Sequence, residues 1–313
     1  MTDSIAHRPV LLGETIDLLA PGPGATVVDG TLGAAGHAFA LLDRVGPDGR
    51  LFGIDRDPDA LEIARTRLAA FGDRFIPIRG RHEDLTRLLR DAGVFACHAM
   101  LFDLGVSSMQ LDRPERGFSF RNDAALDMRM DPSHGESAAD LLARIEETDL
   151  RRIISRWGEE RRSGAIARAI VREREKRALV RTSQLAGLIE RNAGSAARRF
   201  RIHPATRTFQ ALRIVVNGEI EGLEQLVSDA VGMLPRGGRL AFISYHSLED
   251  RAIKTAMRAL AKRCSCPPKL PVCGCGKENL IRVLTRRPIR PGEKEIDRNP
   301  RSRSARLRVA ERL

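Results

Sequence analysis

Aromatic residues and long apolar runs are both scarce in this chain of 313 residues. Phe, Trp and Tyr make up 4% of it, with one Trp and one Tyr, which argues against a single-strand binder built on many base-stacking side chains. No apolar run approaches the roughly 20 residues that a membrane-spanning helix needs. The start, MTDSIAHRPVLLGE, has acidic and proline residues where a signal peptide is apolar. We therefore expect a cytoplasmic protein without a membrane partner.

Cysteine is also infrequent, and four of the five cysteines fall in one segment, CSCPPKLPVCGCG. The fifth, Cys97, lies in the apolar stretch FACHAMLF and is expected to be a small buried side chain. This distribution excludes a disulfide framework spread through the fold. Four thiolates can bind zinc, but zinc loops use C-x-x-C more often than the C-x-C found here, so a reduced loop is the alternative and no metal is assigned. The four residues are Cys264, Cys266, Cys273 and Cys275.

Positive charge is in excess, with 53 Lys and Arg against 41 Asp and Glu and a formal net charge of +12. Such a balance favours polyanionic partners, although a solvated arginine-rich surface produces it as well. Hydrophobic residues make up 42% of the chain, which is enough for one substantial core and a smaller second domain. A disordered chain is therefore not expected.

The first hundred residues alternate between short β-rich runs and amphipathic helical patterns, as βαβ units do. The helical patterns end near glycine, as helices commonly do. A fifth strand is predicted within PRGGRLAFISYHSLED, and IRVLTR and ARLRVAER can pair as an edge hairpin. Together these elements predict an open, doubly wound α/β sheet. The first four strands are predicted at 25–30, 49–55, 74–80 and 98–105.

After the fourth strand the pattern changes, because segment 104–136 is rich in turn-forming residues and has little periodicity. We predict a long functional loop there. From Ser137 to about Ile202 the sequence is helical and dense in arginine, which predicts an all-helical insertion, and one long helix is expected over 209–234. The predicted domains are a discontinuous sheet domain, 1–110 and 205–313, and a helical insertion, 111–204.

Polar residues follow the ends of four successive predicted strands. Asp29 ends the first and runs into GTLGAAGH, a turn that lets backbone amides and a helix N-terminus approach a ligand. Asp55 ends the second, about 20 residues after the glycines, where a carboxylate can accept from both ribose hydroxyls; a helix N-cap is the alternative. His82 follows the third and either flanks an adenine ring or lies on the surface, and Asp103 closes the fourth. We expect a ligand along this edge, at a topological switch point.

A dinucleotide-binding dehydrogenase is the competing interpretation, because such enzymes use similar glycine-rich turns. They more usually show G-x-G-x-x-G spacing, whereas the run from Asp29 to Gly36 reads DGTLGAAG. The terminal hairpin after the fifth strand also fits a methyltransferase sheet better. We therefore expect S-adenosyl-L-methionine as the cofactor, with a nicotinamide cofactor as the second choice.

The sequence resembles the RsmH (MraW) family of ribosomal RNA small-subunit methyltransferases in motifs that span nearly the whole chain. These are HRPVLL, DGTLGAAGH, GIDRDPDAL, FDLGVSSMQLD, RGFSF, LDMRMD, HPATRTFQALRIVVN and SYHSLEDR. The resemblance implies a class I, Rossmann-like sheet interrupted by an all-helical substrate-recognition domain. It also implies S-adenosyl-L-methionine-dependent N4-methylation of a cytidine in the decoding region of 16S rRNA, with the small ribosomal subunit, and not DNA, as partner.

The same resemblance implies a set of cofactor contacts, and at two of them the chain departs from the family's common pattern. Ala35 stands where relatives commonly have the first of two glycines, and His82 stands where they have an aromatic residue. The implied contacts are Gly33, Ala34, Ala35, Gly36, His37, Asp55, His82, Asp103 and Gln110.

Methyl transfer from a sulfonium is an in-line substitution, so the protein mainly positions and desolvates the reactants. Asp103 and the backbone carbonyls of LGVSS are the expected acceptors for hydrogen bonds from the cytosine amino group. Methylation at the ring carbon C5 is disfavoured, because no cysteine lies at the end of the fourth strand. Tyr245 and His246 follow the fifth strand and either face the same crevice or support it by packing. No general base is assigned.

Arginines crowd the helical insertion and its exit, and we expect them to contact RNA phosphates, with a solvated helix face as the alternative for any single one. Asp127 and Arg129 of LDMRMD are interpreted as a loop-ordering ion pair or as RNA contacts. Two other functions compete: a non-catalytic RNA-binding or assembly factor, which Asp55 and Asp103 argue against, and a methyltransferase for DNA or a small molecule. The arginines are Arg151, Arg152, Arg161, Arg162, Arg198, Arg199, Arg201 and Arg207.

Overall fold

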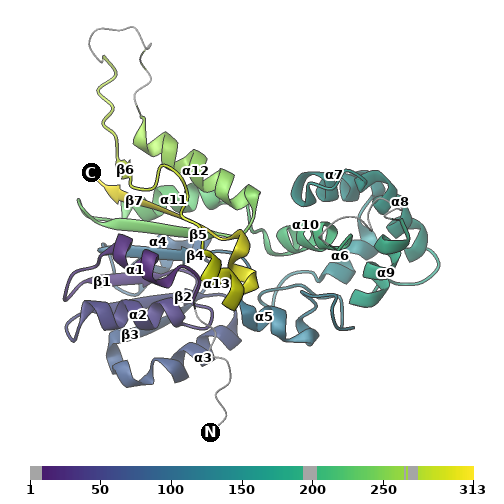
Figure 1. Ribbon diagram of the computed structural model, residues 1–313, viewed down its shortest axis with the longest axis horizontal. Helices are drawn as coiled ribbons and strands as arrows, with labels where there is room; N and C mark the ends of the chain where they lie inside the picture. Colours follow the sequence, from purple (N-terminus) through teal and green to yellow (C-terminus); the bar gives the residue numbers. More distant parts are fainter. Residues whose placement is uncertain (1–8, 193–202, 264–265, 267–273) are drawn as a thin grey trace. The chain divides into compact units, whose positions relative to one another are not determined.

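The computed structural model describes residues 9–192, 203–263, 266 and 274–313. The chain divides into two compact units. The sheet unit is formed by Met1–Gly105 together with Ile220–Leu313, and the helical unit by Val106–Glu219 (Figure 1). Within the described part of the chain, every helix is too short or too polar to span a membrane.

One seven-stranded sheet organises the sheet unit, in the order β3-β2-β1-β4-β5-β7-β6. Strands β1 to β5 are parallel, and β7 pairs antiparallel with both β5 and β6. The predicted doubly wound sheet and its terminal hairpin are therefore confirmed. Chain order reverses between β1 and β4, which creates a topological switch point at the carboxyl ends of these strands. The strands are β1 (Thr26–Asp29), β2 (Arg50–Asp55), β3 (Phe75–Arg79), β4 (Ala99–Asp103), β5 (Arg239–Ser244), β6 (Ile281–Val283) and β7 (Arg306–Arg312).

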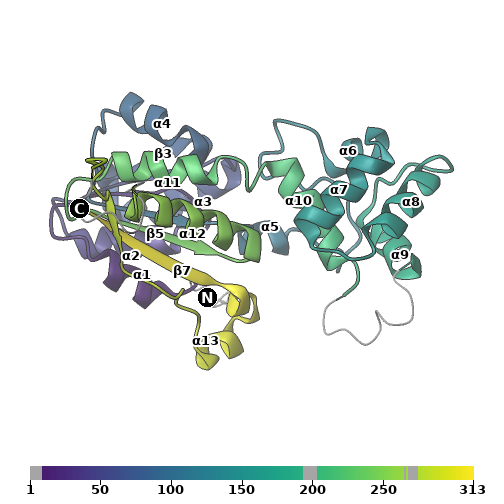
Figure 2. The same cartoon turned by 90° about the horizontal axis from the view of Figure 1, so that it is seen from above.

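Successive strand residues point to opposite faces of the sheet, and both faces are covered by helices. Val28 and Phe102 pack against α4, α11 and α12, whereas Val27 and Leu101 pack against α1, α2 and α3. Figure 2 shows α4 and α11 on one side of the sheet and α1 and α2 on the other. Burial on both faces explains why the strands are nearly continuous apolar runs. The helices are α1 (Leu12–Leu19), α2 (Gly36–Val45), α3 (Pro58–Arg67), α4 (Leu85–Asp91), α11 (Leu223–Gly232), α12 (Ser247–Ala261) and α13 (Glu293–Arg298), with 3-10 turns η1 (Ala69–Arg74), η2 (His82–Asp84) and η5 (Pro300–Ser304).

The helical unit has a hydrophobic core of its own. Leu142, Ile154, Ile170 and Leu185, each from a different helix, are buried in it. The all-helical structure predicted from Ser137 onward is confirmed for the described residues up to Asn192, which form four helices. The helices are α5 (Ser108–Asp112), α6 (Ala138–Arg144), α7 (Glu147–Gly158), α8 (Ser163–Arg174), α9 (Thr182–Asn192) and α10 (Thr206–Asn217), with the 3-10 turn η3 (Pro114–Arg116).

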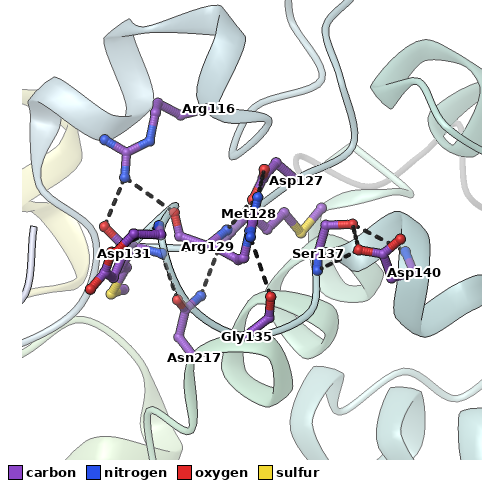
Figure 3. Close-up of polar contacts among 11 residues, drawn as sticks. Arg116, Asp127, Met128, Arg129, Asp131, Gly135, Ser137, Asp140 and Asn217 are labelled. Carbon is purple, nitrogen blue, oxygen red and sulfur yellow. Dashed lines mark hydrogen bonds and ion pairs between the residues drawn. The ribbon is translucent and has the colours of Figure 1, made fainter.

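In the predicted long loop, backbone groups form hydrogen bonds with a side chain of α10 (Figure 3). Asn217 of α10 accepts the Met130 amide at 2.7 Å and donates to the Met128 carbonyl at 2.7 Å. Met128 is buried with a φ of +66°, an unusual value for a residue other than glycine. Asp127 pairs with Arg129 at 2.7 Å, which is one of the two interpretations given to LDMRMD. The loop is therefore ordered, and it also contains α5 and η3.

The single long helix predicted over 209–234 is wrong. The chain leaves the helix at Gly218 (φ +64°) and begins α11 after Gly222 (φ +81°), because both glycines adopt left-handed conformations that end or interrupt a helix. Helix α10 buries Phe209 and Leu212 in the core of the helical unit. The units therefore divide at 105/106 and 219/220, whereas the sequence placed its boundaries at 110/111 and 204/205.

Candidate active site

Three carboxyl groups end β1, β2 and β4; Asp29 is buried, and Asp55 and Asp103 are partly buried. Asp29 is 1% exposed, and burial raises its pKa to about 7 against the opposing hydrogen bond from the Thr31 amide. Burial likewise raises the pKa of Asp55 above its usual range and the pKa of Asp103 to about 7. Such groups ionise readily only beside hydrogen-bond donors or positive charge, so this edge favours a ligand that brings either.

The first backbone amides of the glycine-rich turn, from Thr31 to Gly33, are already occupied. Thr31 donates to Asp29 Oδ1 at 3.1 Å, Leu32 donates to the Ile54 carbonyl at 3.1 Å, and Gly33 donates to Asp55 Oδ2 at 2.9 Å. A dinucleotide-binding turn instead directs its amides at a pyrophosphate. Bonded amides next to three carboxyl groups disfavour a pyrophosphate, which weakens the nicotinamide alternative.

Asp55 belongs to the ligand-facing edge rather than to the helix that follows. Its Oδ1 accepts the Asp57 amide at 2.9 Å, while Asp57 itself is the N-cap of α3 and accepts the Asp59 amide at 3.1 Å. The alternative interpretation of Asp55 as a helix N-cap is therefore wrong. Each oxygen of Asp55 accepts one backbone amide and, with two lone pairs, keeps capacity for a second donor.

Asp103 lies between two side chains from other elements. The Tyr245 hydroxyl donates to Asp103 Oδ1 at 2.9 Å, and His37 Nδ1 lies 3.6 Å from Oδ2. His37 Nε2 lies 3.1 Å from the Val10 carbonyl, which can only accept, so Nε2 carries the proton. The Asp103 side chain is 22% exposed and the His37 side chain 6%, so Asp103 is the more accessible of these two.

The start of α2 explains one glycine and one departure from the expected pattern. A Cβ at Gly36 would lie 2.3 Å from Cγ of Pro9, so only glycine fits there. Ala35, the N-cap of α2, has a φ of +57° and is fully buried. The left-handed conformation costs an alanine about 1 to 2 kcal/mol relative to glycine, which is the residue common at this position in the resembled family.

His82 is the first residue of η2, directly beyond β3, and its side chain is 12% exposed. The surface position considered for it is therefore wrong. Burial lowers its pKa to about 4, so the ring is neutral at pH 7. Its edge packs against Phe102, with the ring centroids 6.4 Å apart, and among the described residues its Nε2 has no hydrogen-bond partner. A neutral ring with an unsatisfied nitrogen suits contact with a nucleobase.

Tyr245 and His246 form the turn between β5 and α12, and Glu249 holds it. Glu249 is 1% exposed, and its Oε2 accepts the amides of Tyr245 at 2.9 Å and His246 at 3.3 Å. His246 is the N-cap of α12. Tyr245 thus reaches Asp103, whereas His246 caps a helix.

Some predicted residues lie elsewhere in the chain. Gln110 belongs to the helical unit, where its Oε1 accepts the Ser107 amide at 3.1 Å in the capping box of α5. Cys97 is buried as expected, and burial raises its pKa to about 12. The residues outside the described part of the chain are Cys264, Cys273, Arg198, Arg199 and Arg201.

Comparison with known proteins decides between the candidate classes. A family model described as the MraW methylase family matches residues 4–313. The chain belongs to the MraW methylase family. A ribosomal RNA small subunit methyltransferase H from Trichlorobacter lovleyi is 52% identical over 310 residues, 98% of each chain. The protein of the same name from Geobacter sulfurreducens is 50% identical over 310 residues, 99% of this chain and 100% of its own.

Membership of this methylase family, together with the observed sheet, confirms the predicted class I methyltransferase fold, the methyltransferase activity and the dependence on S-adenosyl-L-methionine. The residues present fit this donor. Its ribose hydroxyls can donate to a carboxylate, and its sulfonium and ammonium groups supply positive charge to an edge that holds Asp29, Asp55 and Asp103.

Proposed function

We propose that this MraW-family methylase transfers a methyl group to N4 of a cytidine in the decoding region of 16S rRNA, in the cytoplasm and on the small ribosomal subunit. The observation that carries the proposal is the carboxyl edge of the sheet, where three acids with raised pKa values and the occupied amides of Thr31 and Gly33 favour a cationic donor over a phosphate. The names of the 52% and 50% identical relatives support the small-subunit RNA as substrate.

We assign residues of the chain to the ribose, the adenine ring and the methionine carboxylate of the donor. Asp55 would accept the ribose hydroxyls, and His82 would contact the adenine ring. The turn from Gly33 to His37 would receive the methionine carboxylate, because the first amides of α2 have no partner within the helix and favour negative charge. Asp103 and Gln110 complete the proposed set. When bound, the donor supplies an electrophilic methyl group on a sulfonium.

Asp103 is the proposed acceptor for the proton of the cytosine amino group. The N4 lone pair is delocalised into the ring, so a hydrogen bond accepted from the amino group makes N4 a better nucleophile. Asp103 offers a partly exposed carboxyl group at the switch point of the sheet, and its raised pKa of about 7 suits a proton acceptor near neutral pH.

Three arginines of the helical unit form a surface suited to RNA phosphates, which we name the arginine stripe: Arg151, Arg168 and Arg172. Arg168 and Arg172 are four residues apart on the exposed face of α8, and Arg151 Nε lies 3.6 Å from the Cβ position of Gly164, one turn before Arg168. Within the described part of the chain, these arginines form no ion pair, so their charge is available to a polyanion. Phosphate contacts of this kind hold RNA in register without reading its sequence.

Methyl transfer from labelled donor tests the proposed function. Small subunits, free 16S rRNA and DNA are each incubated with the protein, and labelled RNA is digested to nucleosides. We expect label only with RNA, as N4-methylcytidine at one decoding-region position, and a loss of about 100-fold or more in kcat for Asp103→Asn. Asp17→Asn, an exposed acid on α1, is the matched control and should retain activity. Label confined to DNA, or none in any RNA, would contradict the proposal.

A further inference from the structure

Among the residues that the structure describes, one hydroxyl donates to the Asp103 carboxyl group, and it belongs to the chain's one tyrosine. Tyr245 and Asp103 are 142 positions apart and meet because β4 and β5 are neighbours, with Asp103 in register with Ile243. The hydroxyl donates to Oδ1 at 2.9 Å. The position of the Tyr245 ring therefore determines the hydrogen bonding of the acid proposed to receive the substrate proton.

The Tyr245 backbone is held by a hydrogen bond, and its ring lies close to a glycine of the neighbouring strand end. Its backbone amide donates to the buried Glu249 carboxylate at 2.9 Å, which holds the turn before α12. A Cβ at Gly105 would lie 3.3 Å from Tyr245 Cδ2, and Gly105 has a φ of +90°. A glycine is thus present where the backbone turns sharply and the ring approaches closely. This arrangement places the ring where its hydroxyl can donate to Asp103.

The charged and titratable groups around Asp103 mostly oppose its ionisation. Asp29 faces it from β1 and Glu249 from α12, and both negative charges raise its pKa in addition to the effect of burial. His37 faces it from α2 at 3.6 Å. The hydrogen bond from Tyr245 lowers the pKa of Asp103 and so favours the carboxylate.

We propose that Tyr245 is a positioning residue for methyl transfer, whose hydroxyl orients the Asp103 carboxyl group and keeps it ionised for proton acceptance. This inference rests on the proposed function. In the step concerned, the N4 lone pair forms the bond to the methyl carbon while the carbon–sulfur bond breaks and leaves a neutral thioether. The N4 proton passes to the Asp103 carboxylate. A protonated Asp103 cannot accept it, so loss of the Tyr245 hydroxyl removes part of the active population at neutral pH.

Tyr245→Phe tests this role through two titrations. The first follows the Asp103 carboxyl carbon by NMR in the protein alone, and the second follows kcat for methyl transfer against pH. A hydrogen bond to a charged group corresponds to a shift of about one pH unit, so both midpoints should move upward by about that amount. At pH values well above both midpoints, the rates should approach each other. Unchanged midpoints, or a rate loss equal at every pH, would overturn the proposal.

Two further forms of the protein serve as a control and as a second test. Ser244→Ala removes the hydroxyl of the neighbouring residue, which donates to the Arg306 carbonyl at 3.5 Å and not to Asp103, and it should leave the Asp103 midpoint unchanged. Because the chain has one tyrosine, growth on fluorotyrosine alters Tyr245 alone and keeps the ring in place. Its more acidic phenol should lower the Asp103 midpoint, and a midpoint that rises or stays unchanged contradicts the proposal.

The two titrations separate this inference from the proposed function. The carboxyl titration uses no RNA and no donor, so it decides the coupling of Tyr245 to Asp103 even if no RNA is methylated. If the Asp103 midpoint moves in Tyr245→Phe but the pH profile of the rate does not, the role in proton acceptance is overturned.

Discussion

At the scale of single residues, the sheet edge concentrates groups that are unfavourable in the folded chain by itself. Asp29, Asp55 and Asp103 are each buried enough for their pKa values to rise. A buried carboxylate without a compensating charge destabilises the fold. Perturbed pKa values of this kind cluster at functional sites, which supports the proposal that this edge binds the donor and the substrate.

Asp29→Asn is expected to remove a loss of stability that the wild-type protein undergoes as pH rises from about 4 to about 7. The pKa of Asp29 is about 7 in the folded chain and near 3.8 in the unfolded chain, so its contribution is complete below about pH 4 and is lost as pH rises through 7. Asparagine stays neutral and keeps an oxygen for the Thr31 amide. Relative to wild type, we expect the variant to gain about 2 to 4 kcal/mol of unfolding free energy between about pH 5 and pH 8.5, measured by urea denaturation.

Asp17→Asn on α1 is the control for this comparison. Asp17 is exposed, and an exposed carboxyl group changes little in environment on unfolding. The unfolding free energy of Asp17→Asn should therefore depend on pH as that of wild type does. If Asp29→Asn gains no stability relative to wild type between the two pH values, then Asp29 does not titrate near neutrality in the folded protein.

The sequence was informative about individual strand-end residues and uninformative about their partners. Asp55 and Asp103 were expected at the sheet edge because parallel strands end together. Asp29 was noticed as a strand end but not as a titrating group, because its burial depends on the packing of both neighbouring strands. The bond from Tyr245 to Asp103 was not predicted, since it depends on β5 lying next to β4 rather than on any local pattern.

At the scale of elements, α8 divides its two faces between stability and charge. Ile166 and Ile170 are buried in the core of the helical unit, while Arg168 and Arg172 are exposed on the opposite face. Several other exposed arginines of this unit have acidic partners, such as Arg152 with Asp149 at 2.8 Å. An arginine that is already paired releases less energy on meeting a phosphate, so α8 is the element on which RNA affinity should depend most.

The double variant Arg168→Gln/Arg172→Gln should bind 16S rRNA more weakly and with a smaller salt dependence. Each lost phosphate contact reduces the slope of log K against log salt concentration by about 1, so a reduction of about 2 is expected from binding titrations at several salt concentrations. Methyl transfer at saturating RNA should change little, because the arginines are proposed to hold RNA and not to react.

Arg152→Gln/Arg177→Gln removes the same net charge and serves as the control. Arg152 pairs with Asp149 at 2.8 Å and Arg177 with Glu173 at 3.0 Å, so the slope should change less than in the stripe variant. Equal reductions in the two double variants would mean that net charge, and not the arginine stripe, determines RNA affinity.

Helices and strands were predicted correctly where a segment follows one hydrophobic pattern. The prediction failed where two helices with the same apolar spacing follow each other. Strands β1 to β5 were found because runs buried on both faces are apolar throughout. The helical pattern over 209–234 concealed a break, since apolar residues keep their spacing on both sides of Gly218 and Gly222. The segment 104–136 was expected to be irregular, but its anchoring to Asn217 required knowing that α10 lies beside it.

At the scale of the whole molecule, the described residues form two units whose hydrophobic cores share no residue, and the core of the sheet unit has one part on each face of the sheet. One unit packs helices on both faces of the sheet, and the other packs Ile154, Ile170 and Leu212 between helices. Groups from distant parts of the sequence form the sheet unit, because residues 220–313 return to complete it. The proposed donor contacts lie mainly in this unit, so donor binding should stabilise one core more than the other.

Hydrogen exchange with and without S-adenosyl-L-methionine tests this separation. A ligand at about 100 times its Kd stabilises the state that binds it by about 2.7 kcal/mol, which slows exchange through unfolding about 100-fold. With S-adenosyl-L-methionine, we expect this slowing at Val28 and Phe102 in the sheet and little change at Ile154 and Ile170 in the helical unit. NADH should slow exchange in neither unit. Equal protection in both units would mean that they unfold as one, because stabilising either core would then stabilise the other.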